Sequence, residues 1–340
     1  MVSERTFEMK ILFYGTASYD KDSFNKELKS YPNIKIDYVE TNLTPMTAAL
    51  ARGYDAVCAF VNADAGAMTL EILAGFGVKL VLMRCAGFDA VNVPVAKDLG
   101  MKVTRVPAYS PHAVAEYAVT LMLCLNRKVY RSTNRTREWN FKLDGLMGFD
   151  MYGKTVGIVG LGRIARCVAE ILLGFGMKVL AYDLYPDTAF VESHGIEMVE
   201  LNELYRRSDI ITLHVPLTSR TQYMINSVSI DKMKRGVMII NTGRGKLISS
   251  DALIQGLRSG QVSCAGLDVY EDEQKYFYED LSDSIINDDK LSILLTMPNV
   301  IVSSHQAFFT KEAMNNIAMT TLQNIRDFVS GKPLTNEVKP

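Results

Sequence analysis

The stretch VGIVGLGRIA at residues 156–165 decides the fold. An apolar, β-branched run leads into the pattern G-x-G-x-x-A, formed by Gly160, Gly162 and Ala165, and an amphipathic segment follows. In this strand–turn–helix context the first glycine permits a tight turn, the second lets the backbone approach a pyrophosphate, and the small third residue allows close helix–strand packing. Free N–H groups at the helix start attract phosphate. The segment therefore predicts a dinucleotide-binding unit in preference to a glycine-rich turn of an ordinary βα unit.

Asp183 ends the next strand-like run, about 20 residues after the glycines, as the dinucleotide pattern requires. A carboxylate there accepts hydrogen bonds from the adenosine ribose and repels a 2′-phosphate. Leu184, Tyr185 and Pro186 follow it, with no arginine or lysine directly after the acid, so we expect NAD rather than NADP. The cofactor-binding residues predicted in this turn and in neighbouring loops are Gly160, Gly162, Arg163, Ile164, Ala165, Asp183, Val215, Pro216, Thr242 and Asp268.

Strand-like and helix-like segments alternate on both sides of this turn. Before it, apolar runs predict strands at residues 9–15, 34–40, 55–60, 80–85 and 102–106. From the turn onward, six more strands are predicted at residues 155–160, 178–183, 210–215, 237–242, 264–269 and 300–304. Near-continuous apolar strands separated by helices are typical of parallel sheets covered on both faces. The sequence therefore predicts an α/β fold with two doubly wound parallel sheets.

The bulk properties agree with an ordinary globular protein. A length of 340 residues favours two domains, and a formal net charge of -1 gives no reason to expect a nucleic acid or an anionic membrane as partner. The five cysteines form no C-x-x-C pair, so we expect them to be reduced thiols. Histidine, cysteine and aspartate residues show no spacing typical of metal ligands, so we expect no metal site. Because no secretory signal and no run of ~18 apolar residues is present, we expect a cytoplasmic protein.

Three ionisable residues follow predicted strands in the second half of the chain. Arg244 follows the strand at residues 237–242, Glu273 follows the strand at 264–269, and His305 closes the run at 300–304. Each has a plain structural alternative: Arg244 as a surface loop residue, Glu273 as one of several solvated acids, and His305 as a helix cap. Ligands of doubly wound sheets bind beyond the carboxyl ends of the strands, so the three are predicted to converge on one site.

These residue types suit hydride chemistry on a 2-oxo acid. Reduction by NADH delivers hydride to the carbonyl carbon and a proton to the carbonyl oxygen. A histidine that titrates near neutrality can give the proton, and a carboxylate bonded to it favours the imidazolium. An arginine binds a carboxylate with its planar fork of donors. We assign these roles to His305, Glu273 and Arg244 respectively.

Several segments carry a resemblance to a known family. They are the dinucleotide turn with Asp183, NTGRG at 241–245, GLDVY at 266–270 and HQAFFT at 305–310. Together they resemble the D-2-hydroxyacid dehydrogenase family across nearly the whole chain. The resemblance implies that Arg244, Glu273 and His305 are the catalytic arginine, glutamate and histidine of that family.

The resemblance also implies a domain organisation. A Rossmann dinucleotide-binding domain at residues 109–308 is expected to be inserted in a flavodoxin-like substrate domain made of residues 1–108 and 309–340. Within the family the chain is most similar to the branch that acts on D-lactate. The segments that carry this similarity are RCAGFD at 84–89, VPAYSP at 106–111 and YFYED at 276–280.

This likeness implies the substrate contacts. The backbone amides of Ala86 and Gly87 and the guanidinium of Arg244 are expected to hold the substrate carboxylate, Tyr109 to help close the pocket, and Phe308 to line it. The chain departs from the family pattern at Asp89-Ala90, where many relatives have a more amide-rich loop, and at Ala165, where a third glycine is commoner.

Pyruvate and D-lactate are the expected substrate pair. The alternatives are a reductase of larger 2-oxo acids, such as phenylpyruvate or branched-chain analogues, and a non-catalytic protein that senses NAD(H). Extra methylenes change discrimination by only ~1–3 kcal/mol, so the residue pattern leaves the first alternative open. A homo-oligomer, dimer or tetramer, is expected because closed symmetric assemblies are common and the apolar helix near residues 113–125 could serve an interface.

Overall fold

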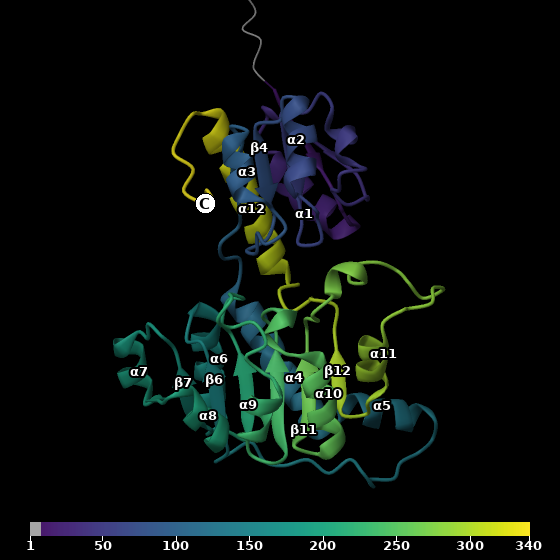
Figure 1. The fold of residues 1–340 in the computed structure, drawn as a ribbon, viewed down its shortest axis with the longest axis vertical. Coiled ribbons are helices and arrows are strands. Elements are labelled where there is room, and N and C mark those ends of the chain that lie inside the picture. The colour runs from purple at the N-terminus through teal and green to yellow at the C-terminus, as the bar shows by residue number, and fades with distance from the viewer. Residues whose placement is uncertain (1–7) are drawn as a thin grey trace, which may run out of the picture. The chain divides into compact units, whose positions relative to one another are not determined.

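The computed structural model of the chain describes residues 8–340 and divides into two compact units (Figure 1). Unit 1 consists of Met1–Ser110 and Phe309–Pro340, and unit 2 of Pro111–Phe308. The chain therefore builds most of unit 1, forms the whole of unit 2, and returns to unit 1 with its last segment. No helix among the described residues is both long and apolar enough to cross a membrane.

Unit 1 is built around a five-stranded sheet. Its strands are β1 (Met9–Phe13), β2 (Ile34–Tyr38), β3 (Ala56–Ala59), β4 (Leu80–Met83) and β5 (Lys102–Thr104). All pairings are parallel, and the order β2-β1-β3-β4-β5 is that of flavodoxin-like sheets. The helical segments are α1 (Ser18–Leu28), η1 (Ala48–Ala51), α2 (Ala67–Gly75), α3 (Val93–Asp98) and α12 (Lys311–Val329). The final helix, α12, packs against α1, which explains why the chain returns to this unit.

Unit 2 contains a seven-stranded parallel sheet. Its strands are β6 (Thr155–Val159), β7 (Lys178–Tyr182), β8 (Glu197–Met198), β9 (Ile210–Leu213), β10 (Val237–Asn241), β11 (Val262–Leu267) and β12 (Val300–Val302). Their order, β12-β11-β10-β9-β6-β7-β8, extends the Rossmann arrangement by one strand. The two doubly wound sheets predicted from the sequence are confirmed. The six strands predicted in this half are all present, but the sheet has a seventh, β8, which was missed because it has two residues and no apolar alternation to mark it.

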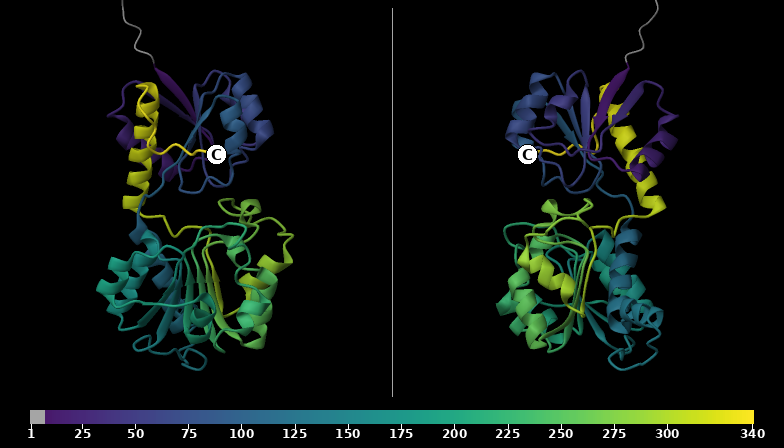
Figure 2. Two further views of the ribbon diagram at one scale, coloured as in Figure 1. Left: turned by 60° about the vertical axis from the view of Figure 1, so that its left-hand side comes forward. Right: turned by 90° about the vertical axis from the view of Figure 1, so that its right-hand side faces the viewer.

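Helices cover both faces of the unit 2 sheet (Figure 2). They are α4 (Pro111–Arg127), α5 (Val129–Arg137), α6 (Arg163–Gly174), α7 (Thr188–His194), α8 (Leu201–Arg207), α9 (Ser227–Asp231), η2 (Gly245–Leu247), α10 (Ser250–Ser259), η3 (Glu273–Lys275) and α11 (Asp289–Thr296). The α4 helix begins at Pro111, where a fixed φ and a missing N–H cost nothing because first-turn N–H groups lack helical partners.

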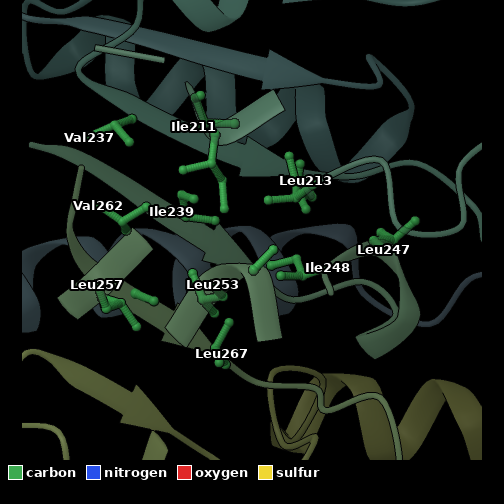
Figure 3. Packing of buried hydrophobic residues seen from close by; sticks show 14 of the residues in the cluster. Ile211, Leu213, Val237, Ile239, Leu247, Ile248, Leu253, Leu257, Val262 and Leu267 are labelled. Carbon is green, nitrogen blue, oxygen red and sulfur yellow. The ribbon is translucent and has the colours of Figure 1, made fainter. Parts of the chain in front are cut away.

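Alternate residues of the central strands fill two separate cores. On β10, Val237 and Ile239 pack with α10 side chains such as Leu253 and Leu257 on one face (Figure 3). The intervening residues Met238 and Ile240 belong to the core on the other face, together with residues of α4 and α6. Both faces of the strand are therefore buried, which is why it reads as a continuous apolar run rather than an alternating one. The predicted catalytic and cofactor-binding residues lie at the carboxyl edge of this sheet.

Candidate active site

The turn between β6 and α6 has the shape that the glycine pattern predicts. Gly160 lies at φ +87°, and a Cβ there would approach the carbonyl oxygen of His214 to 2.7 Å. A side chain is therefore excluded on both conformational and steric grounds. Gly162 caps α6, and a Cβ added to it meets no heavy atom within 4 Å. Ala165 is fully buried under the turn. Open space thus lies directly before the helix N-terminus, where a pyrophosphate can approach.

Asp183 links the turn to the end of β7. Its Oδ2 accepts a hydrogen bond from the Leu161 N–H at 2.6 Å, and its Oδ1 accepts one from the Tyr185 N–H at 2.7 Å. Each carboxylate oxygen keeps a lone pair, so the group can still accept ribose hydroxyls. The acid therefore fixes the backbone of the turn in addition to its predicted contact with the cofactor.

The other predicted cofactor residues lie along the same edge. Arg163 and Ile164 begin α6, Val215 and Pro216 follow β9, and Thr242 follows β10. The Thr242 hydroxyl is one of three buried side-chain oxygens without a hydrogen-bond partner among residues 8–340. An open cradle at the helix start and an unpaired buried hydroxyl fit a polar, elongated group such as NAD.

His214 lies at this edge as well, directly after β9, and its Nε2 is 2.9 Å from the Thr212 hydroxyl. Burial lowers the pKa of His214 to about 4. The imidazole is therefore neutral at neutral pH and adds no positive charge beside the glycine turn.

His305 and Glu273 form a direct pair. The Nδ1 of His305 is 2.8 Å from Glu273 Oε1, and both side chains are less than one-fifth exposed. The second oxygen of Glu273 accepts the N–H of Tyr270 at 2.9 Å, which holds the carboxylate in place. Because Nδ1 is engaged by the carboxylate, Nε2 is the imidazole nitrogen left for a reacting group.

His305 adopts a left-handed backbone conformation, φ +52°, which is uncommon for a residue with a side chain. Three hydrogen bonds hold the backbone around it. Its N–H donates to the Asp268 carbonyl at 2.7 Å, and its own carbonyl accepts the Tyr278 hydroxyl at 2.8 Å. The next residue, Gln306, donates its N–H to Asp268 Oδ1 at 2.9 Å.

The Asp268 carboxylate is the main support of this turn. It is fully buried, and besides Gln306 it accepts the Ser303 hydroxyl at 2.7 Å and the Ala307 N–H at 2.8 Å. Burial raises the pKa of Asp268, although the three accepted bonds and His305 oppose the shift. The sequence predicts Asp268 only as a cofactor residue, and the structure adds that its side chain shapes the loop that carries the histidine.

Arg244 lies in the loop after β10, whose backbone is fixed by the buried Asn241. The Asn241 side chain accepts the Gly243 N–H at 3.0 Å and donates to the Arg244 carbonyl at 2.9 Å. A Cβ at Gly245 would come within 2.0 Å of the Tyr270 carbonyl oxygen, so the Arg244 loop packs tightly against the loop that leads to Glu273. Since β10, β11 and β12 are neighbours, the structure places the three predicted catalytic residues in adjacent loops at one edge.

The predicted substrate-binding residues divide between the units. Phe308 is buried at the end of unit 2, whereas Ala86, Gly87 and Tyr109 belong to unit 1. There the Ala86 carbonyl accepts Arg105 Nη1 at 2.9 Å, and the Tyr109 carbonyl accepts Asn316 Nδ2 at 2.6 Å.

The loop containing Ala86 starts from a buried anchor. Arg84, 2% exposed at the end of β4, donates to Asp20 Oδ1 at 3.3 Å and to the Tyr14 carbonyl at 2.8 Å. Its guanidinium also lies 5.0 Å from the centroid of the Phe60 ring. This anchor joins the carboxyl ends of β1 and β4.

Several supporting residues escape sequence reasoning. Tyr278 and Ser303 each donate one hydrogen bond to an atom distant in sequence, the His305 carbonyl and Asp268 Oδ1, whereas Asn241 binds the backbone of Gly243 and Arg244 close by. Asn241 and Ser303 do lie in or beside the segments that carry the family likeness, but nothing in their spacing marks their partners. Among residues 8–340, no group of three histidine, cysteine, aspartate or glutamate side chains is arranged to hold a metal ion.

Known proteins resemble the chain over nearly its full length. A family model described as "D-isomer specific 2-hydroxyacid dehydrogenase, NAD binding domain" matches residues 119–307. D-lactate dehydrogenase of Escherichia coli (strain K12) is 45% identical over 330 residues, which cover 97% of this chain and 100% of the relative. 2-Hydroxyacid dehydrogenase A of Aspergillus oryzae is 48% identical over 332 residues, which cover 97% and 95% of the two chains.

A solved structure gives the same result. The structure described as the pyruvate reductase of Chlamydomonas reinhardtii has a TM-score of 0.92 and 45% identity, covering 97% of this chain and 99% of the other. Sequence motifs, fold and comparisons agree, and the family predicted from the motifs is confirmed. The chain belongs to the D-isomer-specific 2-hydroxyacid dehydrogenase family, with its NAD-binding domain in unit 2.

Proposed function

We propose that this chain is an NAD-dependent D-lactate dehydrogenase that interconverts pyruvate and D-lactate. The observation that carries the proposal is the His305–Glu273 pair, 2.8 Å apart, on the sheet edge that also holds the glycine turn. The names of the Escherichia coli and Chlamydomonas reinhardtii relatives support pyruvate and D-lactate as the substrate pair.

His305 acts as the acid and base of the reaction. Its Nε2 gives a proton to the carbonyl oxygen during reduction and takes it back during oxidation, while bound NAD(H) supplies or accepts the hydride. Glu273 accepts the Nδ1 hydrogen and so fixes the ring and stabilises the imidazolium. The left-handed backbone at His305 is strained for a residue with a side chain. The surrounding hydrogen bonds hold it in this conformation, which orients the imidazole ring.

Arg244 binds the substrate carboxylate and polarises the carbonyl. A guanidinium presents two parallel N–H donors to a carboxylate, and Asn241 holds the backbone from which that fork extends. Ala86, Gly87 and Tyr109 of unit 1, with Phe308, complete the proposed substrate contacts, and their part rests on the family likeness. Unit 1 is accordingly proposed as the substrate domain.

The test is an NADH-oxidation assay over pyruvate, 2-oxobutyrate and phenylpyruvate, with chiral analysis of the product. The proposal expects pyruvate to have the highest kcat/KM and the product to be the D-isomer. Phenylpyruvate as the best substrate would support a reductase of larger 2-oxo acids instead. Cofactor binding without oxidation by any of the three would contradict an enzymatic function.

We also propose that the protein is a homo-oligomer in the cytoplasm, a dimer or tetramer. The segment between α5 and β6 supports self-association, because it is held in place yet exposes large apolar side chains. Lys128 Nζ and Asn126 Nδ2 bind its backbone at Met147 and Phe149, whereas Trp139, at 84% exposure, projects into solvent. The other exposed large apolar residues of the segment are Phe141, Leu143, Met147, Phe149 and Tyr152.

Sedimentation velocity tests the oligomer. Serine at both Trp139 and Phe141 should shift the protein toward the monomer, whereas Met46→Ser, at an even more exposed apolar position in unit 1, should not. A wild-type protein that sediments as a monomer at micromolar concentration contradicts this proposal.

A further inference from the structure

An arginine lies close to the ribose-binding carboxylate, although none follows that carboxylate in sequence. Arg166 belongs to the first turn of α6, and its Nε donates to the Leu161 carbonyl at 3.2 Å. The N–H of the same Leu161 donates to Asp183 at 2.6 Å. Because both side chains bind the backbone of one residue, the guanidinium and the Asp183 carboxylate lie within roughly 10 Å of each other.

The Arg166 guanidinium is held by a different carboxylate, that of Asp187. Arg166 Nη1 is 2.7 Å from Asp187 Oδ2, and the guanidinium lies 5.4 Å from the centroid of the Phe190 ring. The other oxygen of Asp187 accepts the Phe190 N–H at 3.2 Å and caps α7. The side chains of Arg166 and Asp187 are 34% and 39% exposed, so solvent and ligands can reach the pair. In Figure 1 the labels of α6, β7 and α7 follow one another along one end of unit 2.

We propose that Asp187 is a second determinant of the preference for NAD, because it neutralises Arg166 and holds it in place. A planar guanidinium is a strong partner for phosphate, and Arg166 stands beside the part of the site that distinguishes the two cofactors. Paired with Asp187, it offers no net positive charge to a 2′-phosphate. Asp183 repels that phosphate directly, and Asp187 removes the cation that would attract it. This inference extends the NAD site and does not depend on which 2-oxo acid is reduced.

The test replaces Asp187 with asparagine and measures nucleotide binding without substrate. Asparagine keeps a side-chain oxygen for the α7 cap and removes the negative charge that holds Arg166. Calorimetry with adenosine 2′,5′-bisphosphate and with 5′-AMP gives the ratio of the two dissociation constants. We expect Asp187→Asn to shift this ratio toward the bisphosphate about tenfold, the size of one added charge-assisted hydrogen bond. The ratio of kcat/KM for NADPH to that for NADH should rise in parallel.

Two further variants make the result specific. In Asp187→Asn/Arg166→Gln the gain should disappear, because the released guanidinium is its source. Glu170→Gln removes one negative charge from α6, the helix that carries Arg166, at a position near His194, and should leave the ratio unchanged. An unchanged ratio in Asp187→Asn, or a gain that survives the loss of Arg166, would overturn the inference. If the asparagine variant does not fold, Asp187→Ser, which also caps helices, gives the same comparison.

The binding experiment separates this inference from the proposed function. Nucleotide affinities are measured without any 2-oxo acid, so a protein that failed to reduce pyruvate would still report on Asp187. Conversely, an active D-lactate dehydrogenase whose bisphosphate affinity ignores Asp187 would retain the proposed function and lose this inference.

Discussion

Replacing Asp268 with asparagine tests whether this carboxylate positions His305. The wild-type side chain accepts three hydrogen bonds, from the Ser303 hydroxyl and from the N–H groups of Gln306 and Ala307, at 2.7–2.9 Å. The asparagine oxygen can replace Oδ1 and keep the first two bonds. Its amide nitrogen then faces the Ala307 N–H, a contact between two donors.

The expected cost follows from that mismatch. Losing one charge-assisted bond costs about 1.5–3 kcal/mol, and the buried Ala307 N–H is left unsatisfied at about 1–3 kcal/mol. Removing a buried charge offsets part of this, since burial raises the pKa of Asp268. We therefore expect the free energy of unfolding to fall by about 2–3 kcal/mol. Turnover should fall about 100-fold, because a displacement near 1 Å at a reacting group has an effect of that size.

Urea unfolding and steady-state kinetics measure the two effects. Asp209→Asn is the matched control: Asp209 also accepts a backbone N–H, that of Thr155 at 2.9 Å, but it precedes β9 at the opposite edge of the sheet. The control should lose stability while keeping kcat. An Asp268→Asn enzyme with normal kcat and a raised KM for NADH would refute the positioning role and leave Asp268 as a cofactor contact alone.

Three further outcomes are expected. His305→Gln should lower kcat strongly while fluorescence titration shows NADH binding unchanged; a loss of binding in proportion would contradict the proton-transfer role. Arg244→Lys should raise the KM for pyruvate and lower kcat, because lysine lacks the planar fork, and unchanged values for both would remove its assigned role. His214→Gln should make stability less sensitive to acid. The folded pKa of His214 is about 4, below an unfolded value near 6.5, so the unfolded chain binds more protons between these pH values and stability is lost as pH falls. The wild type should lose at most about 2 kcal/mol more than the variant between pH 7 and pH 5 in urea titrations, and parallel pH curves would contradict this.

The fold could be predicted from the sequence because its signals are local. The turn at residues 156–165 specifies strand, turn and helix within ten residues, and strands buried on both faces appear as apolar runs. The short strand β8 was not predicted, because two residues are too few to show the alternating apolar pattern of a strand. The placement of Arg244, Glu273 and His305 in adjacent loops also followed, since neighbouring parallel strands end at one edge.

The hydrogen-bond network of the site could not be predicted in the same way. No arginine or lysine directly follows Asp183 in the sequence, yet Arg166 reaches the same region from α6. The Asp268 bonds to Gln306 and Ala307 span nearly forty residues and leave no periodic trace. A local pattern identifies which residues can do chemistry, whereas their supports depend on which loops the topology brings together.

Asn241 fixes the loop and Arg244 is the residue proposed to bind substrate, and this separation affects how the substrate range of the enzyme can be changed. Asn241 is fully buried and sets the course of its loop through two hydrogen bonds to backbone atoms. Directed evolution that randomises exposed loop positions around Arg244 should therefore yield folded libraries with altered substrate ranges. Libraries that include Asn241 should instead be dominated by inactive clones, because the backbone that positions Arg244 would no longer be held in place.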